Sequence, residues 1–215
     1  MERVVVVIDP TQLPDYATSL IEVYHRNWGV RTVLLYPQGT SRLHIAQVQS
    51  MVDADAVAAR FWIDLEDLDS VSTGLRRRFD VLAVVPHFEG VVVDSGRLAE
   101  LLDLDWVPMD VLIRFRDKYA LKDHLRSVPG GPRMNASQRV ASLTDVRQFI
   151  GDQNLSRIVV KPNDGMGNSR IAFFDAHTPD SDIVAYLQRN AGAPLVAEEY
   201  LGGREFCVNG QVDDV

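Results

Sequence analysis

The first half of the sequence alternates between short apolar runs and segments whose apolar residues recur at helical spacing. Val4 to Ile8 is an unbroken run of β-branched residues that Asp9-Pro10 ends, which is typical of a strand buried on both faces of a parallel sheet. Leu13 to Trp28 then carries apolar residues three and four positions apart. This spacing predicts a helix that ends near Gly29.

The same alternation continues as far as Leu112. Val30 to Tyr36 and Asp80 to Pro86 predict two more strands, and the leucines between Leu98 and Leu102 indicate an amphipathic helix. Ser41 to Leu75 divides less clearly, and we expect helices and one short strand there. Alternating strands and helices indicate an α/β layer with right-handed crossovers.

A different pattern begins after Leu112. The expected elements are a helix from Arg114 to Val128, a turn at 129–132, a helix at Leu143 to Ile150, a strand at Ile158 to Lys161, a glycine-containing loop at Asn163 to Ser169, a return strand at Arg170 to Phe174, a helix at Ser181 to Arg189, and strands at Pro194 to Glu198 and Glu205 to Val208. Two strands joined by a short loop run antiparallel, so this half is α+β in style. The change of architecture predicts two domains, 1–112 and 113–215.

Composition and charge exclude several classes of protein. The 215 residues are 46% hydrophobic and 24% charged, which is ordinary for a globular chain and unlike a disordered one. The formal net charge is −8, and Arg76 to Arg78 is interpreted as a solvated helix end, so we expect no nucleic-acid partner. The single cysteine, Cys207, fits a reducing compartment. Without a signal peptide or a run of about 20 apolar residues, we expect a cytoplasmic protein that does not enter a membrane.

Lys118 is the first candidate functional residue. On the predicted helix it shares a face with Leu121, Leu125 and Val128, so its ammonium group lies beside an apolar stripe. One interpretation is a phosphate ligand. The other is a stem that lies on apolar surface and extends its charge to water, and Lys118 alone does not decide between them.

The second candidate is the loop that follows the predicted strand at Ile158 to Lys161. The strand ends in Lys161, and the glycines of the loop let backbone N–H groups approach a ligand closely. This combination suits a polyphosphate, although a plain hairpin turn is an equal alternative. The sequence is neither a Walker A loop nor a dinucleotide fingerprint. The loop candidates are Gly165, Met166, Gly167, Asn168 and Ser169.

The third candidate is an acidic segment near the end of the chain. An apolar strand ends in Glu198-Glu199, and Glu205 follows a pair of glycines. These carboxylates suit the amino and hydroxyl groups of an adenosine. A hairpin with solvated acids is the common alternative.

Together the three segments resemble the ATP-grasp superfamily, especially its carboxylate–amine ligases. The matching features are an Arg-Asp-Lys helix, a Val-Val-Lys-Pro strand with a glycine loop, and a Glu-Glu-Tyr-Leu segment, in this order. The resemblance covers 114–212, while residues 1–112 look like the Rossmann-like domain that precedes the grasp. It implies an α/β chain made of a Rossmann-like pre-ATP-grasp domain and the first α+β lobe of an ATP-grasp domain.

The resemblance also implies roles for residues. Lys118 and Lys161 would contact the phosphates of ATP, and the five loop candidates would cover them. Glu198 would accept from the adenine amino group, while Glu199, Tyr200 and Leu201 frame the adenine edge and Glu205 holds the ribose. In this family ATP converts a carboxylate into an acyl phosphate that an amine or a similar nucleophile attacks, with catalysis by positioning and charge stabilisation. The implied partners are small-molecule carboxylates and amines.

Two departures from the family pattern limit what it implies. Asn168 and Arg170 stand where the family more often has serine and glycine. The acid and the Glu-x-Asn motif that hold Mg²⁺ in the family are expected on a further lobe, so no metal ligand is assigned here. We therefore expect a truncated ligase portion that is inactive alone, because the phosphate charge goes uncompensated. The alternative is a non-catalytic nucleotide-binding or interaction protein with a degenerate ATP-grasp fold.

A substrate site is also predicted in the first domain. His87 and Glu89 follow a strand's carboxyl end, where ligands gather in open α/β sheets. Ordinary loop residues are the alternative. An exposed half of an ATP cleft would also favour association, so a homo-oligomer is an open alternative to a monomer.

Overall fold

The computed structural model describes residues 1–11, 14–165, 167, 169–204 and 206. The chain divides into two compact units, a first unit of Met1–Phe115 and a second unit of Arg116–Val215. The boundary predicted after Leu112 falls inside helix α5 (Met109–Arg116). The observed division lies near the end of that helix, between Phe115 and Arg116.

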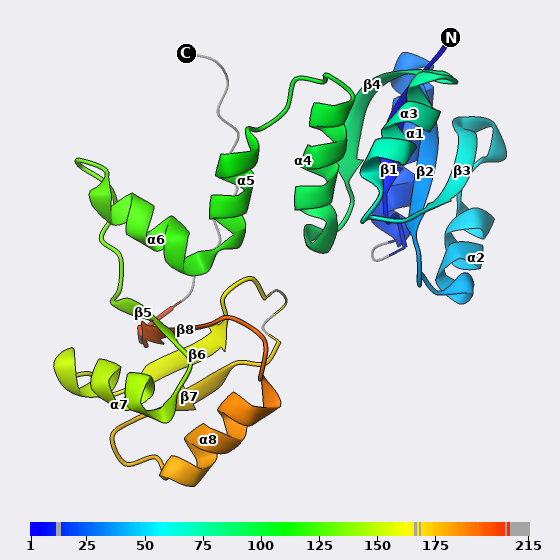
Figure 1. The fold of residues 1–215 in the computed structure, drawn as a ribbon. Coiled ribbons are helices and arrows are strands. Elements are labelled where there is room, and N and C mark those ends of the chain that lie inside the picture. The colour runs from blue at the N-terminus through cyan, green and yellow to red at the C-terminus, as the bar shows by residue number, and fades with distance from the viewer. Residues whose placement is uncertain (12–13, 166, 168, 205, 207–215) are drawn as a thin grey trace. The chain divides into compact units, whose positions relative to one another are not determined.

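The first unit alternates strands and helices around a parallel sheet (Figure 1). Besides α5 its elements are β1 (Glu2–Ile8), α1 (Pro14–Trp28), β2 (Arg31–Pro37), α2 (Arg42–Met51), β3 (Val57–Ile63), α3 (Leu68–Arg76), β4 (Phe79–Pro86) and α4 (Val92–Leu101), with short 3₁₀ turns at Ala54–Ala56 and Glu89–Val91. The strand order is β3-β2-β1-β4, and every pair is parallel. The α/β class and the helix–strand–helix content of 41–75 are confirmed.

Strand β1 is buried on both faces, as its unbroken apolar run predicts. Val4 and Val6 pack in a cluster that includes Leu98 of α4, whereas Val5 and Val7 pack in another cluster with residues of α1 and α2. Successive side chains of a strand point to opposite faces, so one run of valines contributes to both layers of core. The chain adds β2 and β3 on one side of β1 and then β4 on the other side. The strand order therefore reverses between β1 and β4, which is the switch point of this sheet.

The second unit contains an antiparallel sheet. Its elements are α6 (Lys118–Ser127), β5 (Ser137–Val140), α7 (Leu143–Asp152), β6 (Ile158–Pro162), β7 (Ala172–Phe174), α8 (Asp180–Arg189) and β8 (Leu195–Glu199). The strand order is β5-β8-β6-β7, with all pairs antiparallel. The antiparallel hairpin around the glycine loop is confirmed. The strand predicted at Glu205 to Val208 falls on residues that, Phe206 apart, lie outside the described part of the chain.

One sequence prediction around the start of this unit is wrong, and one strand was missed. The helix expected from Arg114 to Val128 is two helices, because Asp117 takes an extended backbone (φ −86°, ψ 102°) and its side chain accepts from the N–H of Ala120 at 2.7 Å. Asp117 is thus the N-cap of α6. Strand β5 was not expected, since its four residues are mostly polar and the strand forms by pairing with the distant β8.

The sheet of the second unit has two unlike faces. Helices α7 and α8 cover one face (Figure 1), where Val160 and Leu195 pack with Phe149 and Ile183. On the other face the strand registers place one row of side chains across all four strands and a second row across three. We call these residues the α6 face, because side chains of α6 bond to them; they are Ser137, Glu198, Val159 and Phe173, then Arg139, Val196 and Lys161.

Candidate functional site

A buried carboxylate shared by two lysines lies at the centre of the α6 face. Oε2 of Glu198 on β8 accepts from Nζ of Lys161 on β6 at 2.9 Å and lies 2.8 Å from Nζ of Lys122 on α6. The Glu198 side chain is only 7% exposed. Its other oxygen, Oε1, is buried and has no hydrogen-bond partner among the described residues. The site therefore holds an unused acceptor beside two donors.

The charges of this cluster do not cancel. Burial raises the pKa of Glu198, but the hydrogen bonds and charges of Lys122 and Lys161 outweigh it and bring the pKa below its usual value. Burial lowers the pKa of Lys122, and the charge of Lys161 lowers it further against the opposing effect of Glu198. Two ammonium groups face one carboxylate, so the cluster carries one surplus positive charge. A buried surplus of this sign favours an anionic ligand.

All three lysines of the chain lie on α6 or near the end of β6, although the chain has 22 lysines and arginines together. Lys118, the first residue of α6, donates through Nζ to the backbone oxygens of Asn163 at 3.2 Å and Gly165 at 2.5 Å. Lysine is a compact charge on a long flexible stem, unlike the rigid fork of arginine. Lys118 thus bonds to the glycine loop, which the sequence analysis predicted to bind phosphate together with it.

Asn163 fixes the start of this loop. Its side-chain oxygen accepts from the N–H of Tyr119 at 3.0 Å, and its backbone N–H donates to Pro194 at 2.8 Å. Asn163 is buried, so these bonds anchor the loop against both α6 and the start of β8. A Cβ on Gly165 would lie 2.9 Å from the Cβ of Pro162, and Gly167 has φ +61°. Both positions of the loop therefore favour glycine.

The predicted adenine edge continues along β8. The side chain of Glu199 accepts from the N–H of Ala136 at 3.2 Å, and its backbone oxygen accepts from the amide of Asn135 at 2.9 Å. The Tyr200 N–H donates to Arg157 at 3.1 Å, while Leu201 is exposed. Glu199 is therefore tied into the sheet rather than extended into solvent.

An aromatic cluster lies beside the end of β8. The rings of Phe173 and Tyr200 meet edge to face with centroids 5.7 Å apart, and the Arg157 guanidinium lies about 5 Å from both ring centroids. Phe173 and Tyr200 remain 48% and 41% exposed. The row of the α6 face that contains Glu198 thus ends in an aromatic side chain, Phe173 on β7.

The structure joins Lys161 to Glu198, and it joins Lys118 to Gly165 of the glycine loop. Ser169 lies in the turn that follows, while Met166, Asn168 and Glu205 lie outside the described residues. Sequence reasoning missed Lys122 and Asn135. The signal for Lys122 was its position four residues after Lys118, which places both on one side of a helix. Asn135 gave no such signal, since it lies in a segment without periodicity.

The substrate candidates of the first unit lie at the carboxyl ends of β1 and β4. His87 donates its backbone N–H to Ile8 at 3.3 Å, and its ring stacks on Tyr16 with centroids 5.5 Å apart. Glu89 begins the 3₁₀ turn before α4. Asp9, which follows β1, is buried with φ +49° and accepts from the hydroxyl of Thr11 at 2.6 Å. The sequence did not single out Asp9 as a site residue.

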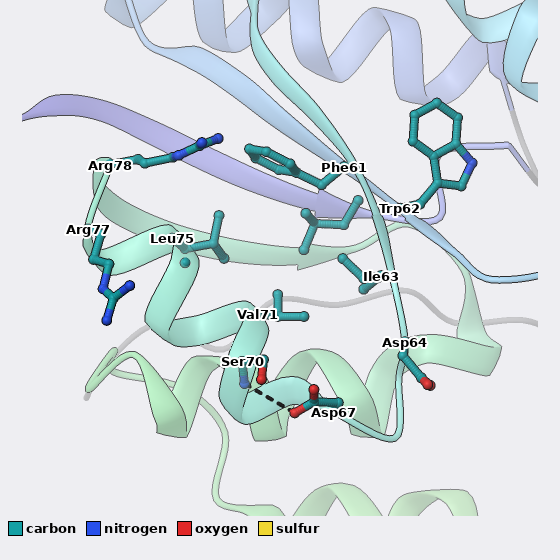
Figure 2. A pocket seen from close by; sticks show the side chains of 12 residues that line it. Phe61, Trp62, Ile63, Asp64, Asp67, Ser70, Val71, Leu75, Arg77 and Arg78 are labelled. Atoms are coloured by element: carbon teal, nitrogen blue, oxygen red, sulfur yellow. Dashed lines mark hydrogen bonds between the residues drawn. The ribbon is translucent and has the colours of Figure 1, made fainter.

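A cavity of about 490 Å³ lies elsewhere in the first unit, between β3 and α3 (Figure 2). Phe61 and Val71 belong to its apolar lining, and the Arg78 guanidinium lies 5.5 Å from the ring centroid of Phe61. His87 and Glu89 do not line this cavity. The cavity and the predicted substrate site are therefore separate features.

Two searches across the described residues gave negative results. The described chain holds no group of three or more His, Cys, Asp or Glu side chains arranged to bind a metal ion. None of the described helices is both long and apolar enough to span a bilayer.

Comparisons with known proteins identify the fold of this chain but not its family. No family model matches the sequence, and no curated protein is significantly similar to it. Among solved structures, L-amino acid ligase from Bacillus licheniformis superposes with a TM-score of 0.69 at 18% identity, over 94% of this chain and 45% of that one. N5-carboxyaminoimidazole synthetase from Staphylococcus aureus, solved with ADP, gives 0.65 at 15% identity over 94% and 48%.

A third structure is the biotin carboxylase domain of the Hydrogenobacter thermophilus 2-oxoglutarate carboxylase, solved with MgADP, ADP and bicarbonate. Its TM-score is 0.61 at 14% identity, over 92% of this chain and 44% of that one. The chain thus spans about half the length of the solved structures that it matches. These structures are ATP-grasp carboxylate–amine ligases, so the resemblance predicted from the sequence is confirmed for the fold: the chain has the fold of part of an ATP-grasp ligase.

Proposed function

We propose that the second unit binds an adenine nucleotide on its α6 face. The observation that carries this proposal is the buried cluster of Lys122, Lys161 and Glu198, which combines a surplus positive charge with an unused acceptor. In this arrangement Lys161 and Lys118 bind phosphates near the glycine loop, and Oε1 of Glu198 accepts from the adenine amino group. Tyr200 and Leu201 lie at the adenine edge, and Glu205 is proposed to hold the ribose.

The matched structures that contain ADP support the choice of nucleotide. We further propose that the chain is a portion of an ATP-dependent ligase that activates a carboxylate as an acyl phosphate for attack by an amine or a similar nucleophile. The first unit would be the Rossmann-like pre-ATP-grasp domain, and the second the first ATP-grasp lobe. His87 and Glu89 would bind substrate at the first unit's sheet edge.

Magnesium at nucleotide sites is usually held by one or two carboxylates together with the phosphates, and we assign no described carboxylate to it. The proposed charge stabilisation in this chain is therefore by Lys118 and Lys161, and Mg²⁺ would require ligands from a further lobe. For this reason we propose that the chain alone binds nucleotide without ligating substrates. A cytoplasmic location and self-association remain predictions from the sequence.

The test is calorimetric binding of ADP and ATP to the chain. We expect binding by the wild-type protein, at least about a tenfold loss in Lys161→Ala, since a charge-assisted contact is removed, and no change in Arg189→Ala on the exposed end of α8. Absence of binding by the wild-type chain would refute the nucleotide site. Hydroxylamine trapping of acyl phosphate with ATP, Mg²⁺ and a panel of carboxylic acids then tests inactivity, which formation of a hydroxamate would contradict.

A further inference from the structure

Glu198 contacts two cations through a single oxygen. Oε2 lies 2.9 Å from Nζ of Lys161 and 2.8 Å from Nζ of Lys122. The two lysine side chains are 23% and 18% exposed, against 7% for the carboxylate. A nucleotide phosphate would therefore compete with Glu198 for Lys161. Glu198 also contacts a second cation, Lys122, which the sequence did not identify.

The two lysines are held differently. Lys161 lies at the carboxyl end of β6, directly before the loop that contains Asn163 and Gly165. Lys122 lies in the middle of α6 and also bonds to Oδ1 of Asn135. The amide of Asn135 in turn donates to the backbone oxygen of Glu199 at 2.9 Å. Lys122 is thus fixed to the segment that forms the predicted adenine edge, while Lys161 adjoins the predicted phosphate loop.

We propose that Lys122 is a positioning residue of the nucleotide site, which keeps Glu198 ionised and oriented toward the adenine amino group while Lys161 binds phosphate. This inference rests on the proposed function. If Lys161 turned to a phosphate and Lys122 were absent, Glu198 would be a buried carboxylate without a contacting cation. Such a group takes up a proton and loses its capacity as a two-oxygen acceptor.

Other charged groups around Glu198 cannot replace Lys122 at this distance. Arg126, one turn further along α6, donates to the hydroxyl of Ser137 at 2.6 Å and to the backbone oxygen of Asn135 at 2.8 Å. Arg139 on β5 lies in the next row and pairs with Asp117 at 2.8 Å. Glu199 belongs to the opposite face of the strand. Lys122 and Lys161 are therefore the two cations that balance Glu198 among the described residues.

The experiment is an NMR titration of glutamate carboxyl carbons in wild type, Lys122→Met, Lys122→Arg and Arg126→Met, with Glu198 assigned from Glu198→Gln. We expect the Glu198 pKa to rise in Lys122→Met above that of the wild type, and to stay low in Lys122→Arg and in the matched control Arg126→Met. An unchanged Glu198 titration in Lys122→Met overturns the inference.

A second readout is nucleotide specificity. IDP differs from ADP in carrying an oxygen in place of the 6-amino group, so the ratio of the two affinities reports the acceptor Oε1. We expect Lys122→Met to lower ADP affinity about tenfold and to reduce the preference for ADP over IDP, more strongly as the pH falls. Lys122→Arg should retain both. An equal loss for ADP and IDP at every pH would indicate a merely structural role and overturn the inference.

The two proposals fail in distinguishable ways. If wild type binds no ADP, the proposed nucleotide site is refuted, whereas the carboxyl titration still tests the coupling of Lys122 to Glu198. If Lys122→Met does not fold, ¹⁵N spectra of the three lysine ammonium groups in wild type decide. ADP should then shift the Nζ signal of Lys161, and the Nζ signal of Lys122 should still change with pH as Glu198 takes up a proton. A shift of Lys122 with Lys161 unchanged overturns the inference.

Discussion

Nζ of Lys161 donates to Oε2 of Glu198 at 2.9 Å although the two residues are not direct partners in the sheet. Lys161 lies opposite Val196, and Glu198 lies opposite Val159, so the bond runs diagonally across β6 and β8. The sequence pattern suggested that these residues serve opposite ends of a nucleotide. Their contact shows instead that Lys161 and Glu198 form an ion pair within the sheet.

Replacement of Glu198 by glutamine should destabilise the chain at neutral pH. Lys122 and Lys161 would lose the carboxylate between them, and breaking a buried pair costs about 3 kcal/mol of unfolding free energy. Because the folded-state pKa of Glu198 is lowered, its contribution is present above its unfolded pKa of about 4.3 and is lost as the pH falls through the folded value. Urea unfolding from pH 7 down to pH 3 measures this difference.

Glu199→Gln is the matched control for that experiment, since Glu199 adjoins Glu198 on β8 and accepts from the N–H of Ala136. A neutral amide oxygen can keep this bond, so a smaller effect is expected. Equal stability of Glu198→Gln and wild type at pH 7, or a difference that does not shrink in acid, would contradict the prediction.

Tyr186 should make the second unit sensitive to alkali. Its hydroxyl oxygen lies 3.0 Å from the backbone oxygen of Val160 and 2.7 Å from that of Arg170, so its one proton is shared between two acceptors, and burial raises its pKa to about 12. A raised folded-state pKa contributes stability that is present below the unfolded value near 10 and lost as the pH rises through about 12. Tyr186→Phe should lose about 2 kcal/mol at pH 8, and its deficit should shrink above pH 10, as followed by urea unfolding. A deficit that grows with pH would refute this explanation.

Arg147 should stabilise the connection before α8 mainly through backbone oxygens. Its guanidinium donates to the backbone oxygens of Asp175 at 3.2 Å and of Thr178, and to the Asp180 carboxylate at 3.0 Å. The Asp180 side chain is 64% exposed, so that ion pair contributes little. We expect Arg147→Met to lower the unfolding free energy by about 2 kcal/mol, because carbonyl oxygens lose their donor.

Two comparisons test this assignment. Asp180→Ala should change stability by less than about 1 kcal/mol, and Arg147→Lys should not restore the loss, since an ammonium cannot reproduce the planar fork. Thermal and urea unfolding measure the order of stability of the three variants. If Asp180→Ala is as damaging as Arg147→Met, the ion pair and not the backbone contacts is the dominant interaction.

Gly167 should be replaceable by asparagine but not by valine. Its φ of +61° lies in the left-handed region, and an added Cβ would meet no described atom within 4 Å. The cost of a side chain is therefore backbone strain alone, which asparagine tolerates better than a β-branched residue. Gly167→Val should be about 1 kcal/mol less stable than Gly167→Asn, measured by urea unfolding. Equal stability of the two would show that the loop adopts another conformation.

Local pattern was sufficient for most of the elements. The valines of β1, the helical spacing of α1 and the glycine loop between β6 and β7 each lie within one segment, so their periodicity identifies them directly. Where contacts with a distant segment determine an element, the local pattern did not predict it. Strand β5 exists because β8 pairs with it, and α6 begins at Lys118 because Asp117 caps it and Asn163 accepts from the Lys118 N–H at 3.2 Å.

The sequence by itself determined the class of each unit and the candidate chemistry, since residue types and their spacing carry both. It identified Lys118, Lys161 and Glu198 as separate candidates. Only the tertiary structure decided that Lys122 completes the cluster and that Glu198 is buried between two cations. The physical reason is that charge balance and burial depend on which side chains meet across α6, β6 and β8, and no local pattern specifies those contacts.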